Sequence, residues 1–116
     1  MAPEEGSDQK PQPDISAILN QMWVRFRPDI YERVEVLDSA AKAHVAGTLT
    51  PGQCAAAHAA AHKLVGSLGT FGLMRGTELA REFEHACAND RTVMATDPSR
   101  LDAIAAEIRK IVDERK

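Results

Sequence analysis

The chain shows the hydrophobic spacing of helices over most of its length, and no stretch keeps the two-residue alternation of a β-strand. From Asp14, which can act as an N-cap, apolar residues recur at three- and four-residue steps and form one stripe: Ile15, Ile18, Leu19, Met22, Trp23 and Phe26. Pro28 removes a backbone donor and crowds the preceding turn, so we expect either one long helix kinked near Pro28 or two helices that meet there. The helical spacing then continues up to Gly47 with Ile30, Val34, Leu37, Ala41 and Val45.

Three further helices follow in the pattern. Thr50, Pro51 and Gln53 combine an N-cap, a proline at the first helical position and a capping box, and they begin a helix that runs to about Phe71, where Gly72 supplies a turn. The next helix is marked by Leu79, Ala80, Phe83, Ala86 and Cys87 and should stop before Asn89. Asp97 and Pro98 open the last one, with Leu101, Ile104, Ala105, Ile108 and Ile111 or Val112 facing inward. Because the connections are short, the sequence predicts an all-α, antiparallel up-down four-helix bundle.

Composition limits the class of protein further. The chain has 116 residues, of which 44% are hydrophobic, which suits one domain with a single core. Residues 1–13 contain three prolines and several charges and predict a disordered tail or linker, which leaves 14–116 for the bundle. Lys and Arg number 14 against 17 Asp and Glu, a net charge of -3, which argues against nucleic acid as a partner. With no secretory signal and no apolar run long enough for a bilayer, we expect a cytoplasmic monomer that does not insert into membranes.

The two cysteines do not suggest a metal site or a redox motif. Cys54 and Cys87 each fall within a helical apolar pattern and lack the spacing of a CxxC pair. We therefore expect two buried free thiols that act as small hydrophobic residues, rather than a disulfide.

The helix after Thr50 carries the most unusual local composition. Glycine inside a helix costs ~1 kcal/mol relative to alanine, yet Gly66 and Gly69 both lie within this one. At ~100° per residue the core face holds Ala57, Ala61, Leu64 and Leu68. His62 then points toward solvent among small neighbours, which are Ala55, Ala59, Gly66 and Gly69, with His58 one turn before it. Such a surface would let another protein close over the histidine, and a neutral imidazole has a free electron pair that can attack an acyl phosphate.

The residues that carry this arrangement run His62-Lys63-Leu64-Val65-Gly66-Ser67, with Gly69 and Gly72 after them. This run resembles the signature of histidine phosphotransfer (HPt) domains, helical-bundle carriers in two-component phosphorelays. In that pattern the histidine is followed by a variable residue, an apolar residue, a position that is often lysine, a glycine and a small residue. The resemblance covers residues 15–116, because the flanking helices match in length and order.

The resemblance implies a role for each matching position. His62 corresponds to the phosphorylated histidine, and Gly66 to the glycine that leaves room for the phosphoryl group. Ser67 corresponds to the small residue that follows, and Lys63 to a lysine that can steady the phosphate. Val65 stands where lysine is often found and should pack against the core, so Lys63 or Arg75 would supply the positive charge. His58 would lie partly buried beside the site, and a receiver would dock over Ala55, Ala59, Gly66, Gly69 and Gly72.

The same resemblance implies partners and a mechanism. A receiver domain that carries an aspartyl phosphate and magnesium would transfer its phosphoryl group to His62, and a second receiver would accept it. We expect no cofactor or metal in the chain itself and no enzymatic activity of its own, because it has no Walker A sequence and no glycine-rich ATP lid. The alternatives are the phospho-accepting domain of a chemotaxis-type histidine kinase and a helical interaction module that does not transfer phosphate. A zinc site at His58 and His62 would need further ligands, and His44 and His85 are interpreted as ordinary surface or boundary residues.

Overall fold

The computed structural model describes residues 14–115, and every regular element within that range is a helix. The elements are α2 (Ile15–Val45), α3 (Pro51–Thr70), α4 (Met74–Ala86), α5 (Asp90–Met94) and α6 (Pro98–Glu114). The prediction of an all-α protein is confirmed. The tail predicted for residues 1–13 lies outside the described residues.

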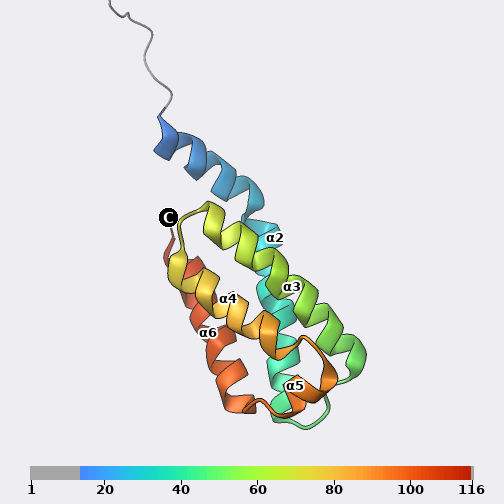
Figure 1. Ribbon diagram of the computed structural model, residues 1–116. Helices are drawn as coiled ribbons and strands as arrows, with labels where there is room; N and C mark the ends of the chain where they lie inside the picture. Colours follow the sequence, from blue (N-terminus) through green and yellow to red (C-terminus); the bar gives the residue numbers. More distant parts are fainter. Residues whose placement is uncertain (1–13, 116) are drawn as a thin grey trace, which may run out of the picture.

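The four long helices pack side by side around one apolar core. Contacts join α2 to α3, α3 to α4, α4 to α6 and α6 back to α2, so each long helix touches two others. Successive long helices run in opposite directions, and the short α5 lies at the end of the molecule where α4 leads into α6 (Figure 1). The largest fully buried side chains are Trp23, Phe83, Ile30, Leu37, Leu64, Leu68, Leu79, Leu101, Ile104 and Ile108.

Helix α2 is one continuous helix with Pro28 inside it, so the alternative of two separate helices is wrong. Asp14 caps it as expected, accepting a hydrogen bond from the Ser16 amide at 3.0 Å. Trp23 is buried against Phe71 in an edge-on ring contact, as a core anchor should be. The apolar stripe led us to expect Phe26 to be a core anchor like Trp23, and this expectation is wrong, because the residue is 42% exposed. The first turns of α2, Ile15 included, extend past the neighbouring helices and leave this part of the apolar stripe uncovered (Figure 1).

The predicted start and end signals of α3 are present. The Gln53 amide donates to the Thr50 hydroxyl at 3.1 Å and the Thr50 amide donates to Gln53 Oε1 at 2.8 Å, which is the expected capping box. At the other end Gly72 has a φ of +73°, in the region that favours glycine, and it turns the chain into α4.

Two features near the chain reversals were not predicted. Helix α5 begins after Asn89, whose side chain accepts from the Thr92 amide at 2.8 Å, and it buries Val93. His44 was expected to be a surface or boundary residue, but it is buried, with only 7% of the residue exposed. Its Nε2 lies 2.9 Å from the main-chain oxygen of Thr96, so the ring ties the end of α2 to the connection between α5 and α6.

The remaining expectations about the interior hold. Cys54 and Cys87 are buried free thiols, and the Cys54 thiol donates to the main-chain oxygen of Cys87 at 3.6 Å. Gly76, which the sequence did not single out, is buried where α4 packs against α3 and α6. A Cβ there would lie 3.1 Å from Leu68 Cδ1 and 3.5 Å from Ile111 Cγ2. Among the described helices, none is long and apolar enough to cross a membrane.

Candidate functional site

His62 lies on the outer surface of α3 with 73% of its side chain exposed. Its Nδ1 is 2.7 Å from Oε2 of Glu84, a residue of α4 that is itself only 16% exposed. A carboxylate can only accept a hydrogen bond, so Nδ1 carries the proton. In a neutral ring this leaves the electron pair on Nε2, on the side of the imidazole away from Glu84. The contact with Glu84 thus leaves the free electron pair of a neutral His62 ring on Nε2.

Glu84 is the polar partner of His62 that the sequence interpretation did not include. The candidate site residues predicted around His62 did not include it, and Glu84 comes from the next helix, 22 residues away. A signal was present: His62 lies eleven residues before Leu73 and Glu84 eleven residues after it. In an antiparallel pair of helices, residues equally distant from the tight turn between them lie opposite each other. The predicted turn at Gly72 lies next to the midpoint between His62 and Glu84.

His58 lies one helical turn before His62 and is half-buried, as the sequence suggested. Its Nδ1 is 2.9 Å from the main-chain oxygen of Glu84. A carbonyl oxygen only accepts, so the His58 Nδ1 also carries a proton. One residue of α4 therefore holds both histidines, His62 through its carboxylate and His58 through its backbone.

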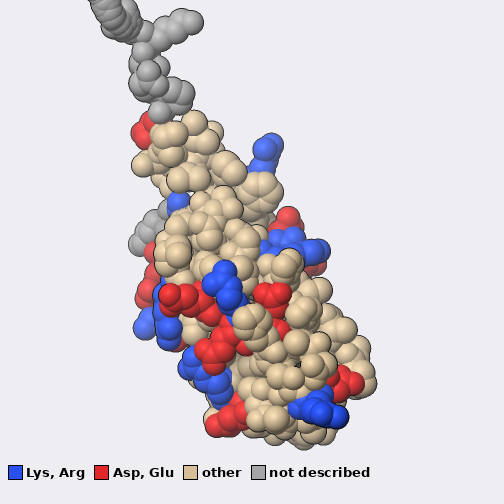
Figure 2. All heavy atoms as spheres, in the orientation of Figure 1, with Lys and Arg blue, Asp and Glu red and all other residues tan. Residues whose placement is uncertain are grey.

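The surface around His62 has little side-chain bulk. Ala55, Ala59, Gly66 and Gly69 are all exposed. Among the atoms of residues 14–115, a Cβ built on Gly66 would find none within 4 Å, and one on Gly69 would reach only the Thr77 hydroxyl at 3.7 Å. Charged side chains gather over α4 and α6, whereas the face along α3 is largely uncharged (Figure 2). We call this exposed face of α3, formed by His62 with Ala55, Ala59, Gly66 and Gly69, the crest. It is open to a partner of matching shape.

A groove of about 470 Å³ lies between α2 and α3 beside this crest. It is lined by Met22, Phe26 and Arg33 from α2 and by Lys63, Gly66, Ser67, Thr70 and Phe71 from α3 and its end. Lys63 and Ser67 therefore lie on the side of α3 that faces α2, while Glu84 and His58 approach from the side of α4. Val65, where lysine is often found, packs partly buried against the core as expected.

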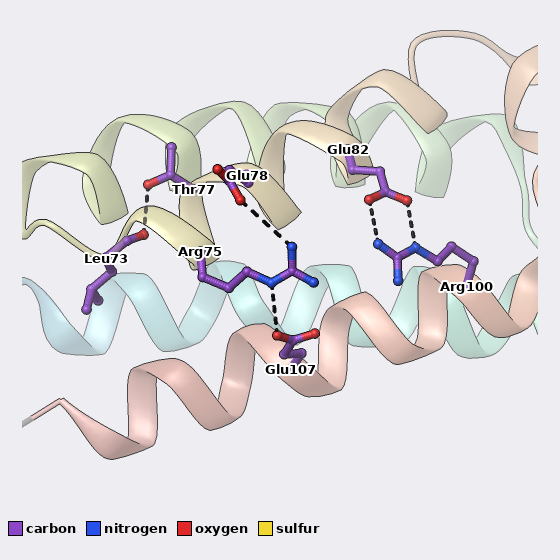
Figure 3. A network of polar contacts seen from close by, with 7 residues as sticks. All are labelled: Leu73, Arg75, Thr77, Glu78, Glu82, Arg100 and Glu107. Carbon is purple, nitrogen blue, oxygen red and sulfur yellow. Dashed lines mark hydrogen bonds and ion pairs between the residues drawn. The ribbon is translucent and has the colours of Figure 1, made fainter.

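Arg75 is not brought to His62. Its Nε lies 3.2 Å from Glu107 of α6 and its Nη1 lies 3.8 Å from Glu78 (Figure 3). At ~100° per residue, nine residues place Arg75 about half a turn from Glu84, on the opposite face of α4. The groove beside His62 is lined instead by two other basic residues, Lys63 and Arg33. Within residues 14–115, no group of three or more His, Cys, Asp or Glu side chains could hold a metal ion.

Comparison with known families identifies this arrangement. The profile of the Hpt domain matches residues 21–114, most of the chain. The chain belongs to the Hpt domain family. Hpt domains carry out histidine phosphotransfer in two-component signalling and interact with receiver domains, which agrees with an exposed histidine on a helical surface. The resemblance recognised in the sequence is confirmed.

One relative adds a measure of similarity. Protein RcaC of Microchaete diplosiphon is 35% identical to this Hpt domain over 74 residues. The match includes 64% of this chain but spans only 11% of the length of that relative. No solved structure gives a significant match.

Proposed function

We propose that this Hpt domain carries a phosphoryl group on Nε2 of His62, accepting it from a receiver aspartyl phosphate and passing it to the aspartate of another receiver. The observation that supports the proposal most strongly is the His62–Glu84 contact at 2.7 Å on a ring that is 73% exposed. It leaves Nε2 as the free nucleophile and leaves it accessible.

The chemistry uses few groups of this chain. The Nε2 electron pair attacks the phosphorus, the bond between phosphorus and the aspartate oxygen breaks, and the carboxylate leaves with the electron pair. The ring then bears the phosphoryl group on Nε2 and the proton on Nδ1, so it gains positive charge. The carboxylate of Glu84 faces that proton and stabilises the charge, as an acidic residue does for a catalytic imidazolium. Transfer to the second receiver is the reverse step, and magnesium belongs to the receivers.

The receiver would cover the crest of α3. Ala55, Ala59, Gly66 and Gly69 would allow its active site to approach Nε2, and Gly72, exposed at the end of α3, would also contact the receiver. Toward α2, the receiver would reach the groove, where Phe26 and Met22 offer apolar contact. Lys63 and Ser67 line the same groove and would steady the phosphoryl group from that side.

The scaffold of this proposal is a monomeric, cytoplasmic, antiparallel up-down bundle that has no enzymatic activity of its own. The ring of contacts among the four long helices and the short connections between them support the bundle arrangement. A bend of α2 near Pro28 is part of the proposal, because proline lacks the N–H that would donate one turn back.

Label transfer from a phosphorylated receiver tests the function. Mixed with a receiver that bears labelled aspartyl phosphate, the wild-type domain should gain an acid-labile label, and His62→Gln should gain none. His85→Gln is the matched control, because His85 is an exposed histidine on α4. Labelling of His62→Gln would refute the proposal. Labelling by an ATP-loaded kinase domain, with none from any receiver, would favour the chemotaxis-type alternative, and no labelling from either source would favour an interaction module.

A further inference from the structure

The last turn of α4 contains a carbonyl that its own helix does not satisfy. The final carbonyls of a helix lack the amide donors of a following turn. Beyond Glu84, the Cys87 amide donates to Phe83 and the Ala88 amide donates to His85, at 3.1 and 3.2 Å. The main-chain oxygen of Glu84 instead accepts from the Nδ1 of His58, at 2.9 Å. His58 therefore caps the end of α4 from the neighbouring helix.

Glu84, whose carbonyl accepts from His58, is also the residue whose carboxylate binds the His62 ring. Within the described part of the chain, Glu84 is the only hydrogen-bond partner of the His62 ring. Its carboxylate reaches the ring through a flexible side chain, so the contact depends on where the backbone of α4 holds its Cα. In a free neutral imidazole of histidine the proton prefers Nε2, which removes the electron pair that transfer requires. The tautomer of His62 therefore depends on the hydrogen bond to Glu84.

We propose that His58 is a positioning residue for phosphotransfer. By holding the last turn of α4, it keeps the Glu84 carboxylate against Nδ1 of His62 and so keeps the electron pair on Nε2. His58 makes no bond to the phosphoryl group in this role. The inference rests on the proposed function in one respect, that His62 is the residue that carries the phosphoryl group.

Two substitutions separate the hydrogen bond from the space that the ring fills. His58→Leu keeps an apolar side chain and removes the donor, whereas His58→Asn keeps an N–H close to the place of Nδ1. The ¹⁵N chemical shifts of the His62 ring, measured at alkaline pH where imidazole is neutral, report its tautomer without any phosphate. The rate of label transfer per folded molecule is measured alongside, with the folded fraction taken from urea unfolding.

We expect wild type and His58→Asn to hold the proton of His62 on Nδ1. His58→Leu should shift it toward Nε2 and slow transfer about two- to tenfold, the range that the loss of one ordinary hydrogen bond gives. In a Glu84→Ala background, His58→Leu should not change the tautomer further. An unchanged His62 tautomer in His58→Leu, or a failure of His58→Asn to restore it, would overturn the inference. The proposed function fails separately, if wild type takes no label.

Discussion

Gly66 offers the sharpest test of why the surface around His62 is bare. Within the described residues nothing requires a glycine there, because a Cβ would find none of their atoms within 4 Å and the backbone does not have a positive φ. Replacing a glycine in a helix interior by alanine should then stabilise the isolated domain by about 0.5–1 kcal/mol, and leucine by nearly as much. The melting temperature should rise by about 4 °C for such a gain in a domain of this size.

Phosphotransfer should change in the opposite direction. Gly66 follows His62 by one helical turn, so the two Cβ positions lie roughly 5–6 Å apart. A leucine at that place would stand where the receiver must approach Nε2. Reacting atoms need to come within about 3–3.5 Å, and a misplacement of about 1 Å can cost about 100-fold in rate. We therefore expect Gly66→Leu to slow transfer by about 100-fold, with Gly66→Ala in between.

Two other glycines provide matched controls on the same scaffold. A Cβ on Gly52, in the first turn of α3, would meet only the Thr50 hydroxyl at 3.9 Å, so Gly52→Leu should keep both stability and transfer. Gly76→Leu should destabilise the fold by about 1–3 kcal/mol through overpacking, because a Cβ there already lies 3.1 Å from Leu68 Cδ1. Urea unfolding followed by circular dichroism gives the stabilities, and label transfer gives the rates. Wild-type transfer by Gly66→Leu, or a loss of stability in that variant, would refute the reasoning.

Three further predictions concern charges and thiols. Glu84→Gln keeps an acceptor for His62 and loses the charge, so transfer should slow about threefold to tenfold, and Glu84→Ala should slow it more; equal rates in both variants would show that the charge has no part. The Arg100 guanidinium bonds Glu82 at 2.6 and 2.7 Å and holds the pKa of that carboxyl below its ordinary value of 4.5. The stability that this ion pair adds is present above that value and is lost as pH falls through the lowered pKa. Because both side chains are nearly half exposed, Glu82→Gln should lower the free energy of unfolding in urea at pH 7 by only about 0.5 kcal/mol. An unchanged free energy of unfolding at that pH would contradict the assignment. Burial raises the pKa of the Cys87 thiol to about 12 and raises that of Cys54, so a thiol reagent at pH 8 should modify the native protein only as fast as it opens, and rapid modification of the folded domain would contradict the burial.

The four long helices, and the caps at Asp14 and Thr50, could be predicted because each depends on local chemistry and on a single apolar face. The capping box at Thr50 and the turn at Gly72 involve residues close together in the chain, so the sequence alone carries their signal. Phe26 shows where this reasoning ends. It belongs to the same apolar stripe as the buried Trp23, yet it is 42% exposed. The pattern identifies which face of a helix is apolar, but it does not show how far the neighbouring helices extend along that face.

A very short helix and a contact between distant segments were harder to predict from the sequence. Helix α5 has only five residues, too few for a hydrophobic period, and its one buried side chain is Val93. His44 is buried because its ring meets the backbone of Thr96, 52 residues later, which no local pattern indicates. A histidine among alternating polar and apolar residues looks the same in sequence whether or not such a partner exists.

Glu84 shows which single piece of information was missing at the site. The turn at Gly72 sets the level at which α4 meets His62, and the burial of Phe83 sets which side of α4 faces the core. The residues on either side of Phe83 then lie about 100° away from it in opposite directions. One of them, Glu84, turns to α3 and holds His62, and the other, Glu82, turns to α6 and bonds Arg100. In a bundle of opposite hand α3 and α6 would exchange sides, and Glu82 would face His62 instead. The handedness of the four-helix arrangement, which depends on how all the helices pack together, therefore decides which carboxylate holds the histidine.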